Sequence, residues 1–587
     1  MKKIIYIFLI AMSCTACSFL DTKIYDNPEG DQPIVDETGC MAGLTGIYDV
    51  LGTSGLYGQN LWADLDAGTD IMYYNRDYGK DYLYVCMYNY NNTDKFVNET
   101  WEMLYVGINR ANDFLAQLAN LSDAQCGGLE KKRMFEAEAR ALRALYYMNL
   151  VAYWGEAPLR LETTRDLSKQ QLKKSPQAAI YKQIFEDLTF GAGTVSDEGD
   201  VKTAGACLPA DKLNTPGRIS RTAAQALLAR AYLWYAGYPT NGNTWKEARA
   251  YAKAVMNSGL HQLKQSESTD PLHRNPYHTV FIDMCSNKYD LTDRESMLEV
   301  EFYGNGLDAS NEAGKVGLYN GVTQGVSYDP DVPFAYGWYN ASHILLRLYD
   351  KKYAVVGDNK PEKEQNDARK WWNLADYTWK KNDVAKKVER VWLTEAQLNS
   401  DNRKACPGKW RVEYDPVRPW ARNNSSINFP IMRYSDVLLM FAEADNEING
   451  PTEDAVEAIN AVRTRANATP IALSDVIPSQ NAYEICDIKT SEGMRQFIFE
   501  ERTRELCFET PRHMELRRMG KDFFFDRINL LQSSDIYENG KKHIIGYPLD
   551  DVASVPARNI DRTKHIYLPI PQCELNTNTI CGQNEGW

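Results

Sequence analysis

The sequence predicts a mainly α-helical fold, in which tetratricopeptide-like helix pairs form a scaffold that carries long irregular loops. Two observations predict the helices. Apolar residues recur three or four positions apart over long stretches, and Ala-rich segments of this kind end at Gly with Pro close behind. A third observation predicts the loops, because three long segments show no sustained helical period. Helix hairpins that recur along a chain are typical of tetratricopeptide-like arrays.

The chain begins with the features of an export signal. Lys2 and Lys3 precede a short apolar run, Ile4–Met12, and small residues follow it. A helix that spans a membrane needs about twenty apolar residues, so this run is too short to be one. We therefore predict a signal peptide over 1–16.

A polar segment with scattered Pro, Gly and Asp follows the signal. We predict that residues 17–40 form a tether and that 41–587 form a single domain. From the residues alone, Cys17 at the start of the tether could be a buried thiol, half of a disulfide, a metal ligand or a point of attachment.

Two long amphipathic helices come first in the domain. In residues 97–121 one apolar face is formed by Trp101, Leu104, Ile108, Ala111, Leu115 and Leu118. Residues 130–159 repeat this spacing, and Gly155 and Pro158 end the second helix. A short loop between two such helices predicts an antiparallel hairpin.

Two later segments, 222–239 and 434–450, resemble the second helix because small residues alternate with bulky ones. Each is followed by another amphipathic helix, over 244–259 and over 452–467. Small residues let two helices approach closely. The spacing of these hairpins is irregular, so we predict an interrupted array with long inserts.

The inserts are the segments 55–95, 265–340 and 350–430, which are rich in Tyr, Trp, Asn, Asp and Gly. Loops of this length inside a compact protein are usually functional. We therefore predict that the ligand-binding residues lie in these inserts.

Charge and composition limit the classes of partner. The net charge is −13 and the chain has no long basic run, so we predict no nucleic-acid partner. The 36 tyrosines favour a binding surface, because Tyr combines a flat apolar face with a polar edge. The cysteines beyond Cys17 are scattered, which favours isolated buried thiols, although a disulfide between Cys573 and Cys581 is also considered.

The sequence offers one candidate pair of catalytic carboxylates. Glu501 and Glu505 could lie close together on one helix face, as glycoside hydrolysis requires. Arg502 and Arg504 are interleaved with them, so ion pairing on the helix surface is the better interpretation. No zinc-protease, nucleophile-elbow or phosphate-loop motif is present in the sequence. We predict no catalytic residues, no metal ligands and no cofactor, and only the acidic stretch near Asp66 leaves a bound calcium open.

The segment 70–92 is the first candidate ligand-binding loop. Tyr side chains that stack on a sugar ring are interleaved there with Asn, Asp and Arg, which can bond its hydroxyls. The alternative is that these tyrosines pack in the core or in a half-buried strand. The candidate ligand-binding residues of this segment are Tyr74, Arg76, Tyr78, Tyr82 and Asn89.

The segment 326–350 is the second candidate, with a helix predicted to begin near Ala341. Its candidate ligand-binding residues are Tyr328, Tyr336 and Trp338. The alternative here is that the aromatic side chains anchor the loop on the scaffold. The aromatic run 370–379 is a weaker third choice.

Five blocks of the sequence resemble the SusD/RagB family of outer-membrane nutrient-binding lipoproteins, in the family's order and over nearly the whole chain. They are FEAEARALRALYYMNLVAYWGEAPL, GRISRTAAQALLARAYLWYAG, PIMRYSDVLLMFAEADNEI, FIFEERTRELCFETPRHMELRRMG and IYLPIPQCEL. The resemblance implies a right-handed superhelical scaffold of four tetratricopeptide-like helix pairs with minor β hairpins. It also implies that Arg76 and Tyr78 match the position from which the family contributes an arginine and aromatics to a glycan site.

The resemblance further implies acylation of Cys17 after cleavage of a lipoprotein signal peptide. The acyl chains would anchor the chain in the outer membrane, facing the cell exterior. Two departures from the family pattern occur. Cys14 stands where the lipobox usually has Leu, which leaves Cys14 as an alternative acylation site. After the ERTREL block, ETPRHMELRR replaces the family's commoner pattern of small, aromatic and acidic residues.

These observations together predict a non-catalytic cell-surface glycan-binding lipoprotein. It would capture oligosaccharides and pass them to a TonB-dependent SusC-like outer-membrane transporter. The alternatives are capture of oligopeptides, a surface glycosidase, and a purely structural scaffold that binds the transporter and no ligand.

Overall fold

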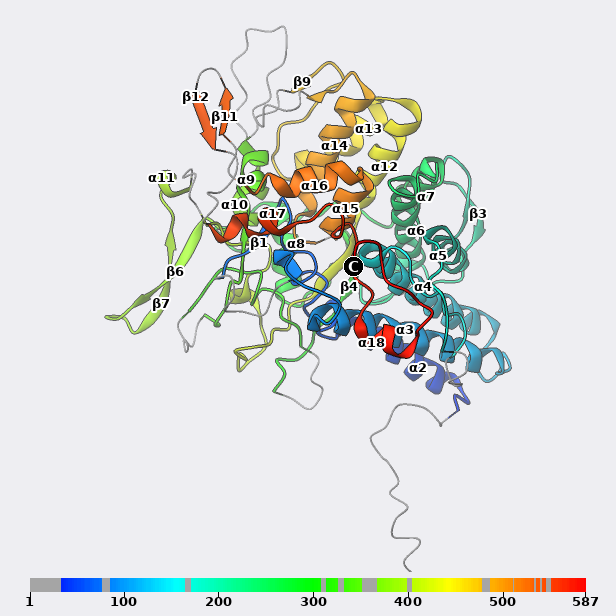
Figure 1. The fold of residues 1–587 in the computed structure, drawn as a ribbon. Coiled ribbons are helices and arrows are strands. Elements are labelled where there is room, and N and C mark those ends of the chain that lie inside the picture. The colour runs from blue at the N-terminus through cyan, green and yellow to red at the C-terminus, as the bar shows by residue number, and fades with distance from the viewer. Residues whose placement is uncertain are drawn as a thin grey trace, which may run out of the picture.

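The computed structural model confirms the mainly α-helical fold class (Figure 1). The structure describes residues 33–76, 85–163, 170–307, 313–325, 332–350, 367–398, 404–477, 486–509, 511–532, 535–538, 541–544 and 551–587. The predicted signal peptide, Cys14 and Cys17 lie outside these described residues. Among the described residues, no helix has the length and apolar character needed to cross a bilayer.

The helices are α2 (Glu37–Asp49), α3 (Lys95–Ala119), α4 (Leu129–Trp154), α5 (Gln177–Ala192), α6 (Arg221–Ala236), α7 (Trp245–Asn257), α8 (Pro276–Cys285), α9 (His343–Asp350), α10 (Ala368–Asn373), α11 (Glu395–Leu398), α12 (Tyr434–Asn449), α13 (Glu453–Arg465), α14 (Ser491–Leu506), α15 (Arg512–Arg518), α16 (Lys521–Asn529), α17 (Val555–Asn559) and α18 (Gln572–Thr577).

The strands are short and pair only in antiparallel twos within the described chain. They are β1 (Met72–Tyr74) with β5 (Tyr339–Ala341), β2 (Gly193–Val195) with β3 (Val201–Ala204), β4 (Ser296–Val300) with β8 (Phe429–Arg433), β6 (Tyr377–Asn382) with β7 (Lys387–Trp392), β9 (Val476–Ile477) with β10 (Cys486–Asp487), and β11 (Asp535–Glu538) with β12 (Lys541–Ile544). The minor β hairpins are thereby confirmed.

The predicted helix hairpins are present as α3–α4, α6–α7 and α12–α13. Helix α5 packs between α4 and α6, and α12 packs on α7, so the hairpins form one continuous scaffold (Figure 1). Local signals set the ends of these helices. The carboxylate of Asp94 accepts from two backbone N–H groups at the start of α3, and Gly155 ends α4 with a φ of +70°.

The folded body begins earlier than predicted. Asp36 caps α2, and Cys40, Leu44 and Ile47 form its buried face. Residues 37–40 therefore belong to the body and not to the tether, because this apolar spacing gives the helix a face to bury against α3 and α4.

The inserts contain more regular structure than their composition predicts. Helix α8 and strand β4 lie within 265–340, and the β6–β7 hairpin projects from the body within 350–430 (Figure 1). Tyr88 and Tyr90 do not form the strand considered for them, because Tyr88 follows a 3₁₀ turn with a φ of +55°. The helix expected near Ala341 is α9, which begins at His343.

Many of the described tyrosines are buried and serve packing, not a binding surface. Tyr146, Tyr147 and Tyr153 on α4 are buried, and each hydroxyl donates to a backbone carbonyl oxygen. A buried Tyr is stable when its hydroxyl finds such a partner, so tyrosine content alone does not measure binding surface. All ten described cysteines are free, and the proposed partners Cys573 and Cys581 are not bonded to each other.

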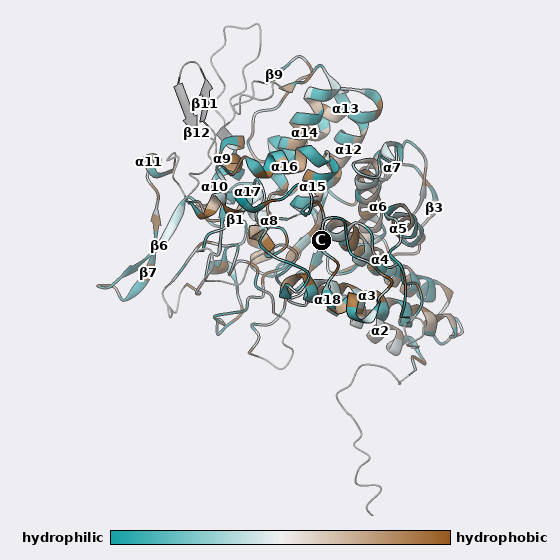
Figure 2. Cartoon of the chain, in the orientation of Figure 1, coloured by the Kyte–Doolittle hydropathy of each residue, from teal (hydrophilic) through white to brown (hydrophobic). Residues whose placement is uncertain are grey.

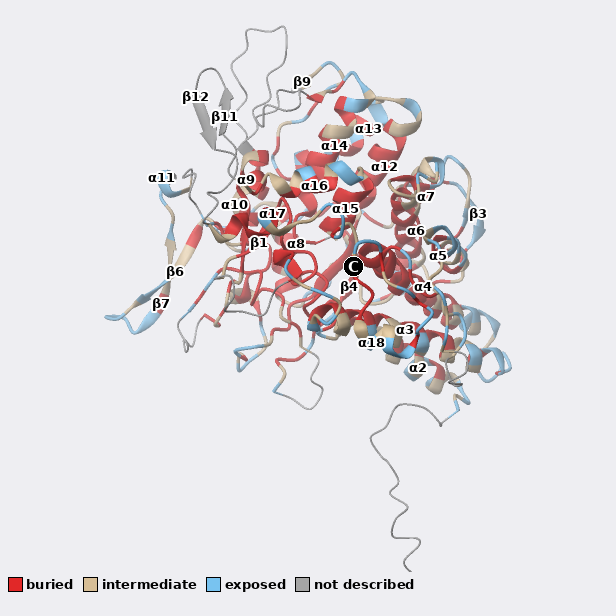
Figure 3. Cartoon of the chain, in the orientation of Figure 1, coloured by how far each residue is buried: buried red, intermediate tan, exposed pale blue. Residues whose placement is uncertain are grey.

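The prediction of surface ion pairs on α14 is wrong. Figure 2 colours parts of α14 and α15 as hydrophilic, whereas Figure 3 shows these helices largely buried. Glu501 and Glu505 are both 0% exposed. The reason is that cationic side chains from α10, β8 and α13 reach them inside the protein, as Arg369, Arg433, Arg463 and Arg465.

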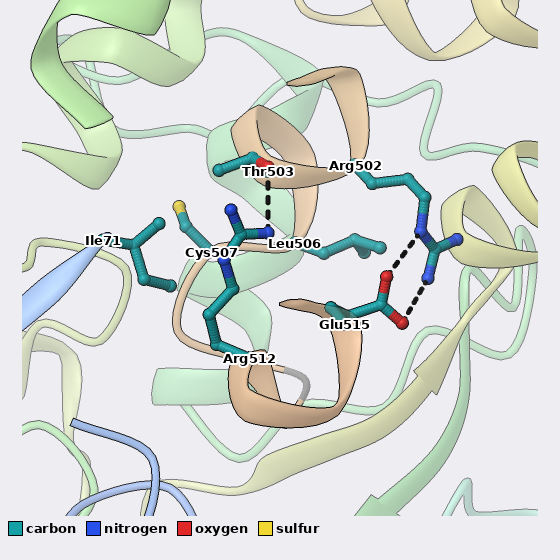
Figure 4. Close-up of a pocket in the computed structure, with 7 residues that line it drawn as sticks. All are labelled: Ile71, Arg502, Thr503, Leu506, Cys507, Arg512 and Glu515. Carbon is teal, nitrogen blue, oxygen red and sulfur yellow. Dashed lines mark hydrogen bonds and ion pairs between the residues drawn. The ribbon is translucent and has the colours of Figure 1, made fainter. Parts of the chain in front are cut away.

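A small cavity lies beside this buried network, between α14, α15 and Ile71 (Figure 4). In it Arg512 donates to the hydroxyl of Thr503, and Arg502 pairs with Glu515. The cavity has room for about one water molecule, so it is a packing defect and not a sugar site.

Close contact between α3 and α4 depends on Gly107. A Cβ atom at this position would lie 2.4 Å from Cζ of Tyr146, which is fully buried. We expect Gly107→Ala to lower the free energy of unfolding by about 1–3 kcal/mol, because overpacking outweighs the better helix propensity of Ala. Gly46→Ala on α2 is the matched control, since nothing lies within 4 Å of its added Cβ.

The control variant should gain about 0.5–1 kcal/mol, because Ala restricts the unfolded chain more than Gly does. Urea denaturation of both variants measures the difference. Equal stability of the two variants would show that the helices separate without penalty.

Candidate functional site

Segments from the first two candidate loops meet at the β1–β5 pair. Tyr74 lies opposite Tyr339 in this pair. Beyond the strand, the backbone N–H of Asn75 donates to the carbonyl oxygen of Trp338 at 2.9 Å. The Arg76 guanidinium donates to the carbonyl oxygen of Tyr336 at 3.0 Å. The two loops are therefore joined by backbone geometry, although more than 250 residues separate them.

Two further segments complete this region. The backbone N–H of Trp338 donates to the carbonyl oxygen of Tyr319 at 2.7 Å, which brings in residues 313–325. Gly314 and Ser425 form an isolated antiparallel bridge, which brings in residues 422–425. The hydrogen bonds of such bridges fix the loops without regular secondary structure.

Aromatic side chains gather where these segments meet. The rings of Tyr319 and Trp338 stack, with centroids 3.9 Å apart and planes 17° apart. Tyr336 packs against Trp338 at 5.4 Å, and Tyr74 meets Trp338 edge-on at 6.3 Å. Phe334 adds an edge contact to Tyr336 at 4.7 Å. We term these five side chains the aromatic cluster.

Gly337 lies between Tyr336 and Trp338 in the sequence, and its backbone conformation lets both rings lie in the cluster. Its φ of +53° is in the left-handed region, and a Cβ there would lie 2.0 Å from Oγ1 of Thr323. Only Gly fits this position.

The cluster has a buried base and a partly exposed surface. Tyr74 and Tyr319 are 3% and 7% exposed, whereas Tyr336 and Trp338 remain partly accessible. Below it, the Tyr339 hydroxyl donates to Oδ1 of the buried Asp64 at 3.0 Å. Burial raises the pKa of Asp64 to about 7, although bonds from Gln59 and Tyr339 favour the charged form.

Polar and cationic groups surround the accessible rings. The Tyr336 hydroxyl donates to Oδ1 of Asn423 at 2.7 Å, and Nζ of Lys315 donates to the Asn423 carbonyl oxygen at 2.9 Å. The Arg422 guanidinium lies 5.9 Å from the Tyr336 ring centroid. Aromatic planes beside amide, ammonium and guanidinium donors can stack on a sugar ring and bond its hydroxyls.

The structure brings together Tyr74, Arg76, Tyr336 and Trp338 among the predicted ligand-binding residues. It places Tyr74 beneath the others, where it supports Trp338. Asn89 is exposed elsewhere, and the adjacent Tyr90 packs against His565 and Trp587. The remaining candidates Tyr78, Tyr82 and Tyr328 lie outside the described residues.

Sequence reasoning missed Tyr319, Lys315, Arg422 and Asn423. Phe334 was also missed, although it lies within the second candidate segment and only two residues before Tyr336 in the sequence, which was a usable signal. The others lie in segments without periodicity, and only the bridges between loops bring them to the cluster. In the third aromatic run, Trp372 is fully buried.

The described residues offer little for catalysis or metal binding at this site. Glu501 and Glu505 are buried, and strong pairing with arginines keeps them ionised. Burial alone would raise the pKa of Glu505, but Arg465, Arg433 and Arg369 lower it to about 2. No group of three or more His, Cys, Asp or Glu in the described chain could hold a metal ion. Near Asp66, the flanking Asp70 is already paired with Arg512.

The fold and the cluster define a helical-repeat protein that presents an aromatic cluster on its loops. A model of the SusD family matches residues 319–587. A second model, described as starch-binding and associating with the outer membrane, matches residues 71–233. The chain therefore belongs to the SusD-like family.

Relatives match along almost the full length. SusD-like protein P25 of Formosa agariphila is 25% identical, over 98% of this chain and 97% of the relative. A SusD homologue from Bacteroides thetaiotaomicron has a similar structure, with a TM-score of 0.74 and 23% identity over 95% of this chain and 98% of that one.

Two further solved structures carry descriptions of a ligand. A laminarin-binding SusD-like protein matches with a TM-score of 0.63 and 23% identity, over 94% of this chain and 100% of that one. Surface glycan-binding protein A of Bacteroides fluxus matches with a TM-score of 0.64 and 19% identity, over the same shares. At these identities the likeness shows the fold.

Proposed function

We propose that this chain is a non-catalytic glycan-binding protein whose ligand stacks on the aromatic cluster. The observation that carries the proposal is the partly exposed Trp338, which Tyr319 and Tyr74 hold in place and polar groups surround. A rigid aromatic plane binds the C–H face of a sugar at little entropic cost, because its support is already ordered. The descriptions of the laminarin-binding and surface glycan-binding relatives support the same ligand class.

The proposal extends to location and partner. Cys17 carries acyl chains that hold the protein on the outer membrane, facing the cell exterior, and the captured oligosaccharide passes to a TonB-dependent SusC-like transporter. The signal-like N-terminus and the outer-membrane description of the second family model support this part. More than one acyl chain gives stable anchoring, whereas a single chain is marginal.

Trp338→Ala should abolish retention by a polysaccharide. Loss of the stacking plane weakens binding by roughly tenfold or more. Affinity electrophoresis in gels that contain laminarin, starch, polygalacturonate or carrageenan measures retention of the protein without its N-terminal tether.

Trp392→Ala is the matched control, because Trp392 is 44% exposed on β7 and lies outside the aromatic cluster. Circular dichroism and thermal midpoints confirm that both variants are folded. Retention of Trp338→Ala equal to that of the control would place the binding site elsewhere.

A further inference from the structure

Three cationic side chains lie around the aromatic cluster. The Arg76 guanidinium donates to the Tyr336 carbonyl oxygen, and the Arg422 guanidinium lies beside the Tyr336 ring. Lys315 donates to the carbonyl oxygen of Asn423, and the Tyr336 hydroxyl donates to the side chain of the same Asn423. These cations come from three different segments of the chain. Their arrangement around the cluster is therefore a property of the fold and not of a local basic run.

Within the described part of the chain, the charge of these three groups has no acidic partner. Among the described residues, no carboxylate lies within ion-pair distance of Arg76, Lys315 or Arg422. The two buried lysines of the described chain are paired: Lys409 with Glu509, and Lys264 with Asp283 and Asp290.

Lys315 differs from these lysines in its electrostatic environment as well. Burial lowers the pKa of Lys315, whereas bonds to Asp283 and Asp290 outweigh burial and raise the pKa of Lys264. A partly desolvated ammonium without a counter-charge is unfavourable in the free protein. An anion bound beside it would remove this penalty.

Two buried carboxyls bond segments of this region: Asp64 accepts from Tyr339, and Asp415 accepts from Ser426. Asp64 lies beneath the cluster and Asp415 precedes the loop that carries Arg422, and burial raises the pKa of both groups. The chain as a whole has a net charge of −13, so this cationic region runs against the overall charge.

The positions of Lys315 and Arg76 are fixed before a ligand binds. The Lys315 N–H donates to the Gly58 carbonyl oxygen at 3.0 Å, and the preceding Gly314 is bridged to Ser425. Arg76 lies two residues after the end of β1, and its guanidinium is held by the Tyr336 carbonyl oxygen. Charged groups held in this way pay less entropy on binding than flexible surface lysines do.

We propose that the aromatic cluster takes an anionic oligosaccharide, in which a carboxylate or sulfate ester on a ring stacked at Trp338 bonds Lys315, Arg76 and Arg422. The inference rests on the proposed glycan-binding function and narrows its ligand class. Uronic acids and sulfated sugars share the required chemistry, an acceptor oxygen with negative charge beside an apolar ring face. Charge-assisted hydrogen bonds to such an oxygen are about twice as strong as neutral ones.

The test uses pairs of polysaccharides that differ only in charge. One pair is polygalacturonate and its methyl ester, and the other is a sulfated galactan and the same galactan after desulfation. Affinity electrophoresis of the protein should show roughly ten- to hundredfold tighter binding to the charged member of at least one pair. The pair that responds identifies the anionic group. The preference should weaken between about 0.05 and about 0.5 M NaCl, because salt screens the attraction.

Lys315→Met should remove most of this preference, and Lys315→Arg should restore it. Lys182→Met is the matched control, since it removes one charge from an exposed pair on α5. Equal binding of neutral and charged polymers would overturn the inference and leave the proposed function standing. Binding to none of the four polymers, and to neither laminarin nor starch, would overturn both. An equal loss in Lys182→Met would also overturn the inference, because net charge alone would then explain the preference.

Discussion

Replacing Arg433 with Met should lower the free energy of unfolding by about 3–5 kcal/mol. Arg433 is 1% exposed and bonds three carboxylates: Glu295 at 2.8 Å, Glu505 at 3.0 Å and Glu509 at 2.6 Å. Met keeps most of the volume but removes the charge. The carboxylates then remain buried with fewer cations, and this uncompensated charge is the main source of the loss.

The matched control is Arg562→Met. Arg562 also bonds two carboxylates, Asp522 and Asp526, but its side chain is 46% exposed. Exposed pairs contribute about 0–1 kcal/mol, because water and salt screen them. Urea denaturation measures both variants, and a shift of the midpoint at an unchanged slope of free energy against urea concentration reports the change in stability. Equal losses in the two would show that the buried network contributes no more than a surface ion pair.

The scaffold was predictable because its signals are local. Helices α3, α4, α6 and α12 show the 3.6-residue period, and α4, α6 and α12 end at Gly. These features are set within a few residues. Helix α14 was placed correctly as a helix but wrongly at the surface. Its charged residues are buried because partners arrive from α10, β8 and α13, and a single segment carries no trace of that arrangement.

The candidate site was predictable only in part, for the same reason. Trp338 and Tyr336 stood out because aromatic residues are clustered in the sequence, and Arg76 was chosen through the family resemblance. Lys315 and Asn423 reach the cluster through the Gly314–Ser425 bridge, which joins segments about one hundred residues apart. Such pairings depend on loop geometry, and no pattern of residues in the sequence predicts them.

We expect the stability of the protein to fall steeply below about pH 4, where unfolded carboxyl groups begin to take up protons. Asp70 and Glu505 drive this fall. Burial alone would raise the pKa of each group, but Arg512 and Arg527 lower that of Asp70 to about 2, and three arginines lower that of Glu505 to about 2. The two carboxylates contribute their full stabilisation when the pH is above the pKa that they have in the unfolded chain. This stabilisation is lost as the pH falls through their lower pKa in the folded protein.

Glu299 should act in the opposite direction at higher pH. Burial raises its pKa to about 7, although Asn428 donates to it at 3.0 Å. A carboxyl with a raised pKa contributes stability at low pH and loses it as the pH rises through about 7. The free energy of unfolding should therefore be greatest near pH 5 and fall on both sides, by more on the acid side because more groups with lowered pKa values titrate there.

Urea midpoints at about pH 8, 5 and 3 test this shape. Asp70→Asn should lower stability near pH 5 but flatten the acid side, because that group no longer titrates. Glu299→Gln should flatten part of the alkaline side and raise the midpoint at pH 8, because the raised pKa of Asp64 contributes to the same side. Glu389→Gln on β7 should leave both sides as they are, since solvent screens its bonds to Asn382 and Lys387. A wild-type midpoint that stays level from pH 5 to 3 would mean that the buried carboxylates titrate alike in the folded and unfolded chains. The ion network would then add nothing to stability at neutral pH.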